Sequence, residues 1–88
     1  MYYVYLLQSL KCDRFYIGCT VSVEKRLALH NCGRVFSTKP YRPWQIIHVE
    51  AYRNQNDALR RERYLKTSQG ARLLKRMLKD YFYFQKNL

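Results

Sequence analysis

The sequence predicts an α+β domain in which a small three-stranded sheet is covered by three helices. Short segments rich in tyrosine, valine and isoleucine are followed by segments with the spacing of an amphipathic helix. The 88 residues are 48% hydrophobic, which is enough for one modest core, so we expect a single domain spanning residues 1–88. Three strands cannot enclose a core alone, and helices must therefore cover one or both faces of the sheet.

A hairpin and a short helix are expected in the first part of the chain. Residues 2–9 have the composition of a strand, turn residues follow, and the strand pattern resumes at 14–19. Ser22 is a suitable N-cap for the next helix, and Gly33 is placed to end it in a left-handed conformation. The residues on one face of this helix are Val23, Leu27 and His30.

The rest of the chain is expected to form a loop, a third strand and two further helices. Residues 33–44 contain two prolines and three basic residues and are typical of an exposed loop. Residues 45–52 predict the third strand, and a second helix follows from about 57 to 68. Gly70 is expected to break that helix before the last one, over residues 71–84. The predicted order is strand, strand, helix, strand, helix, helix.

The charge of the chain points to a polyanionic partner. There are 17 Lys and Arg residues against 6 Asp and Glu residues, a formal net charge of +11. A domain this basic favours nucleic acid, with DNA preferred and RNA as the alternative. No apolar run approaches membrane-spanning length and no signal sequence is evident, so we expect a cytoplasmic protein without a membrane partner. The three cysteines lack zinc-pair spacing and argue against a disulfide framework.

Glu62 is the most informative single residue. On a helix it neighbours Ala58, Leu65 and Lys66, which places a carboxylate beside the apolar side of that helix. One interpretation is an intrahelical ion pair with Lys66. The other is a carboxylate held at the edge of the core, where it can bind a hard divalent cation.

Arg26 and His30 are the second candidate pair. They lie four residues apart on the first helix and border its buried face. A guanidinium can hold a phosphate, and an imidazole can donate to a phosphoryl oxygen or relay a proton. A solvated arginine and a histidine at the core edge are an equally good interpretation. His48, inside the third strand, is expected to be a partly buried, hydrogen-bonded structural residue.

Four short motifs occur in order along the chain. They are "YVY" (3–5), "YIG" (16–18), "VEKRLALH" and "ALRRERYLK". In this order and spacing they resemble the GIY-YIG nuclease domain, and the resemblance covers residues 2 to about 78. The chain is similar to small stand-alone bacterial members of this superfamily and to the N-terminal nuclease domain of an excision-repair subunit.

The resemblance implies an antiparallel three-stranded sheet and hydrolysis of phosphodiester bonds with one Mg²⁺ or Mn²⁺ ion. It places the metal-binding glutamate on Glu62, the family arginine on Arg26 and the frequent histidine on His30. Tyr5 or Tyr16 would orient or deprotonate the attacking water, and Tyr16 is the favoured choice. The basic residues expected to bind nucleic acid are Lys39, Arg42, Arg60, Arg63 and Lys66.

Three functions remain open from the sequence. The leading hypothesis is a metal-dependent endonuclease acting on DNA in repair or in the processing of branched DNA. The alternative is a non-catalytic nucleic-acid-binding protein that keeps the nuclease fold. Three departures keep that alternative open: Tyr3 replaces the glycine of the first signature, and Cys19 stands where related repair nucleases often carry a lysine. The third is that the last helix offers no counterpart of the late asparagine seen in some relatives. A small basic RNA-binding protein would explain the charge but not the carboxylate on an apolar helix face.

Overall fold

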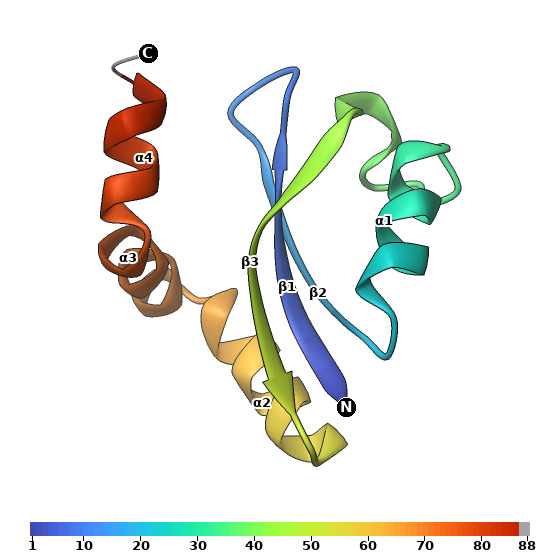
Figure 1. Ribbon diagram of the computed structural model, residues 1–88, viewed down its shortest axis with the longest axis vertical. Helices are drawn as coiled ribbons and strands as arrows, with labels where there is room; N and C mark the ends of the chain where they lie inside the picture. Colours follow the sequence, from blue (N-terminus) through green and yellow to red (C-terminus); the bar gives the residue numbers. More distant parts are fainter. Residues whose placement is uncertain (87–88) are drawn as a thin grey trace.

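A computed structural model describes residues 1–86 and shows a three-stranded antiparallel sheet with helices on both faces (Figure 1). The strand order is β2-β1-β3, so the predicted α+β class and the small sheet are confirmed. In chain order the described elements are β1 (Tyr2–Ser9), β2 (Phe15–Thr20), α1 (Val23–Asn31), the 3-10 helix η1 (Lys39–Tyr41), β3 (Trp44–Tyr52), α2 (Gln55–Leu65), α3 (Ser68–Met77) and α4 (Lys79–Lys86).

The central strand β1 is buried on both of its faces. Residues 4–9 are all buried, because a central strand covered on both sides has no solvent-facing row of side chains. In the register of the sheet, Tyr5 lies opposite Gly18 of β2 on one side and Val49 of β3 on the other. This register brings the two tyrosine-bearing motifs together in space.

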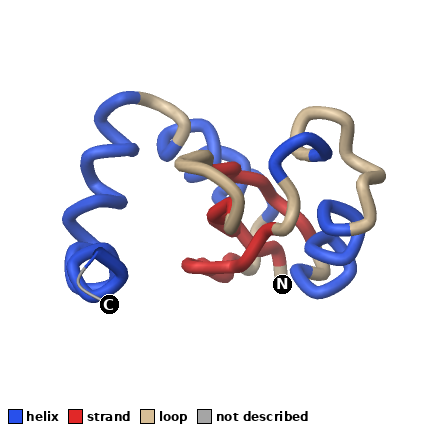
Figure 2. Tube along the Cα trace, turned by 90° about the horizontal axis from the view of Figure 1, so that it is seen from above, coloured by secondary structure: helices blue, strands red, loops and turns tan. Residues whose placement is uncertain are grey.

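Each face of the sheet has its own apolar core. Alternate side chains of β1 point to opposite faces and supply both cores. Figure 2 shows α1 and the loop that follows it on one side of the strands, and α3 and α4 on the other. The buried core residues beneath α1 are Tyr5, Leu7 and Trp44. Those beneath α2 and α3 are Val4, Leu6, Ala58, Leu65 and Leu74. Within residues 1–86, no helix is both long and apolar enough to cross a membrane.

The predicted caps of α1 are confirmed. The side chain of Ser22 accepts a hydrogen bond from the backbone nitrogen of Lys25 at 3.4 Å, as an N-cap should. Gly33 follows the helix with a φ of +82°, a conformation that glycine adopts without strain. The sequence therefore fixes both ends of the helix that carries Arg26 and His30.

Gly70 does not break the second helix, contrary to the prediction. It lies inside α3, and the break comes earlier, at Thr67, whose hydroxyl accepts a hydrogen bond from Gly70 N at 3.1 Å. A Cβ atom at position 70 would lie 2.5 Å from the Cα atom of Leu65. Gly70 is therefore used for close packing of α3 against the end of α2 and not as a helix terminator.

The last predicted helix is two helices, so the described residues contain four α-helices and not three. α3 ends at Met77, and α4 turns back towards the end of the sheet (Figure 1). The Tyr81 hydroxyl donates a hydrogen bond to Gln8 Oε1 at 2.5 Å. The Phe82 ring packs edge-on against Phe15, with ring centroids 5.8 Å apart. These contacts attach α4 to β1 and β2.

Candidate active site

Tyr5 is the centre of the candidate site. Its side chain leaves β1 on the face covered by α1 and is 2% exposed. Because Tyr5 lies opposite Gly18, its ring occupies the space that a side chain at position 18 would fill. A Cβ atom at position 18 would lie 2.5 Å from Tyr5 Cζ. The bare backbone of Gly18 therefore makes room for the Tyr5 phenol.

The buried side chain of His30, on α1, contacts the Tyr5 phenol. The imidazole is 0% exposed, its Nε2 lies 3.0 Å from Tyr5 Oη, and its Nδ1 lies 2.8 Å from Thr38 Oγ1. Burial, together with the nearby positive charge of Arg26, lowers the pKa of His30 from 6.5 to about 4. His30 is therefore neutral at pH 7, and both of its nitrogens are occupied by protein groups. His30 therefore lies buried between Tyr5 and Thr38 and holds the Tyr5 phenol by a hydrogen bond.

Tyr16 comes from the edge strand β2 and is only half-buried. Its ring centroid lies 4.8 Å from that of His30 and 6.2 Å from that of Tyr5. The two phenols and the imidazole thus form one aromatic cluster on the α1 face. Of the two tyrosines, Tyr16 is the more open to solvent.

Arg26 adds a positive charge to this cluster. Its half-buried guanidinium lies beside the phenol oxygens of Tyr5 and Tyr16, and hydrogen bonding to Tyr5 is the main reason why the pKa of Arg26 is raised. None of the ion pairs found among residues 1–86 involves Arg26. The site therefore holds a cation next to two phenols, without a carboxylate that neutralises it.

Glu62 approaches from the opposite face of the sheet. It lies on α2, which packs against β1 and β2, and its side chain is 17% exposed. Burial, and after it the Glu62 charge, raise the pKa of the Cys19 thiol on β2. Burial is the main cause of the raised pKa of Tyr5, to which the negative charge of Glu62 also contributes as the smallest of several causes. Glu62 is thus within electrostatic reach of Tyr5 and Cys19, although its helix covers the other face of the sheet.

The protonation state of Tyr5 follows from two opposing effects. Burial raises the pKa of Tyr5 above 10.0, and the hydrogen bond to Arg26 opposes this increase without cancelling it. Tyr5 is therefore a neutral phenol at pH 7 and acts as a hydrogen-bonding group. A base acting at neutral pH has to be sought elsewhere in the site.

The residues present fit a divalent cation that is shared with a substrate. Within residues 1–86, no group of three or more His, Cys, Asp or Glu side chains gathers as a metal cluster. Mg²⁺ does not need one, since it is commonly held by one or two carboxylates together with substrate phosphates. Glu62 would be the carboxylate available for such an ion. In the structure Glu62 accepts a hydrogen bond from Lys66 Nζ at 3.1 Å, which is the intrahelical ion pair that the spacing predicts.

The other predicted nucleic-acid-binding residues fall into two groups. On α2, Arg60 is paired with Asp57 at 3.0 Å, and Arg63 is exposed. In the loop between α1 and β3, Lys39 and Arg42 lie together, with Arg42 Nε donating to the Lys39 carbonyl at 2.9 Å. The structure does not bring these two groups together, because they belong to helices and loops on opposite faces of the sheet.

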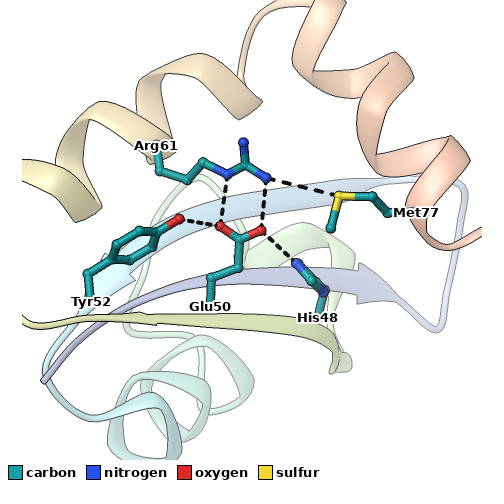
Figure 3. A network of polar contacts seen from close by, with 5 residues as sticks. All are labelled: His48, Glu50, Tyr52, Arg61 and Met77. Atoms are coloured by element: carbon teal, nitrogen blue, oxygen red, sulfur yellow. Dashed lines mark hydrogen bonds and ion pairs between the residues drawn. The ribbon is translucent and has the colours of Figure 1, made fainter.

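The sequence did not reveal Thr38 or Glu50. Thr38 is 1% exposed and completes the buried chain from Tyr5 through His30, although its sequence context is that of an exposed loop. Glu50 lies in β3 and accepts two hydrogen bonds from Arg61, at 2.8 and 3.1 Å (Figure 3). A glutamate between Val49 and Ala51 was the available signal, because a carboxylate in a covered strand needs a partner.

The network around Glu50 attaches α2 to the sheet. His48 Nε2 lies 2.9 Å from Glu50 Oε2, and Tyr52 donates to Glu50 Oε1 at 2.7 Å (Figure 3). Although burial opposes it, hydrogen bonding, from Arg61 above all, lowers the pKa of Glu50 to about 2. The partly buried, hydrogen-bonded role predicted for His48 is confirmed.

Comparison with known protein families decides the assignment that the motifs suggested. A family model described as the GIY-YIG catalytic domain matches residues 1–76. The chain belongs to the GIY-YIG family. The matched residues run from the start of the chain into the last turn of α3 and include Tyr5, Tyr16, Arg26 and Glu62.

Relatives of this GIY-YIG chain carry names that state no activity. A UPF0213 protein of Staphylococcus haemolyticus is 36% identical over 75 residues, which cover 84% of this chain and 90% of the relative. A UPF0213 protein of Syntrophus aciditrophicus is 36% identical over 74 residues, covering 82% and 84%. One from Clostridium perfringens is 37% identical over 68 residues, covering 75% and 71%. No solved structure gives a significant match.

Proposed function

We propose that this GIY-YIG protein is a divalent-metal-dependent endonuclease that hydrolyses phosphodiester bonds of DNA, with roles in repair or in the processing of branched DNA. The observation that carries the proposal is the arrangement of Tyr5, Tyr16 and Arg26 on one face of the sheet, with Glu62 within electrostatic reach. The net charge of +11 supports a polyanionic substrate. A protein that only binds nucleic acid does not require this combination of residues.

In the proposed mechanism Arg26 neutralises charge on the phosphoryl oxygens as the transition state forms. It is suited to this role because it does not have to leave a carboxylate first. Tyr16, the more exposed of the two phenols, orients the attacking water. The buried Tyr5 and His30 rings pack against the Tyr16 ring and fix its position. The Tyr5 phenol also holds Arg26 by a hydrogen bond.

Glu62 would hold the metal ion, Mg²⁺ or Mn²⁺. When bound, such an ion polarises the scissile phosphate and stabilises the departing oxygen. Lys66, which pairs with Glu62 and has a side chain that is 52% exposed, would be available to bind a backbone phosphate of the substrate.

The test is nicking of supercoiled and branched DNA in Mg²⁺ or Mn²⁺. We expect Glu62→Gln and Arg26→Gln each to slow nicking by at least about 100-fold, since each removes a group that stabilises charge in the transition state. Asp57→Asn is the matched control, because it neutralises an exposed carboxylate on the same helix. We expect it to leave the rate unchanged.

Nicking that survives both site substitutions would exclude the proposed site. Metal-independent binding without cleavage of any DNA substrate would instead support the non-catalytic nucleic-acid-binding protein. Melting temperatures of all variants, measured in parallel, separate loss of the site from loss of the fold.

A further inference from the structure

Phe36 is the most exposed large hydrophobic side chain of residues 1–86, with 92% of its surface accessible. Burial of a phenylalanine side chain stabilises a protein, and Phe36 contributes almost nothing of this kind. Phe36 belongs to the loop between α1 and β3, and this loop lies on the other side of the sheet from α4 (Figures 1 and 2). A single exposed ring is common on protein surfaces, so Phe36 points to a partner only together with the groups that surround its loop.

The loop presents Phe36 from a fixed backbone. The backbone nitrogens of Thr38 and Lys39 both donate to the Val35 carbonyl, at 3.2 and 3.0 Å. The indole of the buried Trp44 donates to the Thr38 carbonyl at 3.0 Å. Phe36 therefore projects from a hydrogen-bonded turn whose next buried residue is anchored in the core.

Basic side chains surround an open hollow beside this turn. Its lining residues are Lys11, Asn31, Lys39, Pro40, Arg42 and Pro43, and they include no carboxylate. Arg42 packs against the bare backbone of Gly33, where a Cβ atom would lie 2.7 Å from Arg42 Nη1. None of the ion pairs found among residues 1–86 involves Lys11, Lys39 or Arg42, so these three charges are not neutralised within the described chain.

The loop and the candidate active site share an anchor. Thr38 bonds to His30, and His30 bonds to Tyr5, so the buried end of the loop contacts the group that positions the site. A strand of nucleic acid bound along the loop would therefore lie on the α1 face, where Arg26 and Tyr16 are found.

We propose that Phe36 and the basic hollow bind an unpaired nucleotide of the DNA substrate, with the base stacked on the Phe36 ring and the adjacent phosphates on Lys39 and Arg42. An exposed aromatic ring on the same loop as Lys39 and Arg42, which form no ion pair within residues 1–86, matches the π-face of a base and the charge of the backbone. The inference rests on the proposed function and narrows its substrate class to DNA that contains single-stranded nucleotides, such as gaps or flaps. Fully paired duplex offers Phe36 no free base to stack on.

The test is equilibrium binding in the presence of a chelator, so that no cleavage occurs. The probes are a duplex with a short single-stranded gap that contains 2-aminopurine, and the same duplex fully paired. Wild-type protein should prefer the gapped DNA and quench its fluorescence. Phe36→Ala should weaken binding to the gapped DNA by at least about fivefold and leave paired duplex unchanged, while Phe36→Trp should retain the preference.

Phe84→Ala is the matched control, since Phe84 is also exposed, at 64%, but lies on α4. Equal behaviour of Phe36→Ala and Phe84→Ala, equal wild-type binding of gapped and paired DNA, or a preference for gapped RNA would each overturn the inference. Nicking that depends on Glu62 with no effect of Phe36→Ala would overturn this inference alone. A Phe36-dependent preference without Glu62-dependent nicking would overturn the proposed cleavage alone. Absence of binding to any DNA would overturn both.

Discussion

Arg26 and Arg61 are the same kind of residue in opposite situations. Arg61, on α2, makes two hydrogen bonds to Glu50 and lies over the Tyr64 ring, 5.8 Å from its centroid. Arg26, on α1, lies beside two phenols and has no carboxylate partner among the ion pairs of residues 1–86. Both guanidinium groups are charged, but within residues 1–86 Arg61 is paired with a carboxylate and Arg26 is not.

This difference separates a paired arginine on one face of the sheet from an arginine without an ion pair among residues 1–86 on the other, while Glu62, the proposed metal ligand, lies on the same helix as Arg61. On the face covered by α2, the Glu50 network satisfies its own charges and fixes a helix to a strand. On the face covered by α1, Tyr5 and His30 are buried as neutral groups beside an unneutralised cation. An anion is therefore attracted to the second face and has nothing to gain from Arg61 on the first.

Acid should destabilise the two faces in two separate steps, which is the largest effect that we expect. The His30 pKa falls from 6.5 to about 4 on folding, so its contribution is complete above pH 6.5 and is lost as the pH falls towards 4. The Glu50 pKa falls from 4.5 to about 2, so its contribution is complete above pH 4.5 and is lost as the pH falls towards 2. Each step amounts to about 3 kcal/mol of unfolding free energy.

Denaturant unfolding between pH 7 and pH 2 measures both steps. His30→Gln should reduce the loss of unfolding free energy between about pH 6.5 and pH 4, and Glu50→Gln the loss between about pH 4.5 and pH 2. Stability that stays constant from pH 7 down to pH 4 would show that His30 is not held neutral by the fold. That result would remove the contrast between the two faces.

Loss of Arg61 should cost stability and leave the proposed chemistry intact. Arg61→Gln leaves the Glu50 carboxylate, which is 14% exposed, without its main partner. Breaking such a pair costs about 3 kcal/mol. Arg60→Gln is the control, because Arg60 is 69% exposed and pairs with an exposed Asp57; it should change stability by no more than about 0.5 kcal/mol. Similar melting temperatures of the two variants would contradict the structural role of Arg61.

The smallest expected effect is that of Arg26 on stability. Arg26→Gln removes no ion pair found among the described residues, so the unfolding free energy at pH 7 should change by no more than about 0.5 kcal/mol. The positive charge of Arg26 helps to lower the pKa of His30. Arg26→Gln should therefore also reduce the loss of unfolding free energy between about pH 6.5 and pH 4. A large loss of stability at pH 7 would make Arg26 a structural residue like Arg61.

The sequence predicted the elements whose signals are local. The hairpin, the caps of α1 and the third strand follow from strand composition, Ser22 and Gly33. Gly70 misled the prediction, because its role comes from the close approach of α3 to the backbone of α2, a tertiary contact that propensity does not express.

The candidate site is predictable from the sequence as a set of residues but not as an arrangement. The motifs alone point to Tyr5, Tyr16, Arg26, His30 and Glu62, and their roles remain a proposal. The full burial of Tyr5 and His30 depends on which residue lies opposite Gly18 and on how Thr38 folds back beneath the helix. Such pairings between distant segments are not encoded in the spacing of one segment. The pairing of Arg61 with Glu50, which has no counterpart for Arg26 among residues 1–86, is likewise not encoded in the spacing of one segment.

The most direct test of this contrast is the single-turnover nicking rate of Arg26→Gln and of Arg61→Gln on supercoiled DNA with Mn²⁺, at a temperature at which both variants are folded. We predict that Arg26→Gln is slower than wild type by at least about 100-fold and that Arg61→Gln stays within about twofold of it. Nicking by Arg26→Gln at the wild-type rate, or an equal loss in both variants, would contradict the assignment of the unneutralised arginine to the substrate.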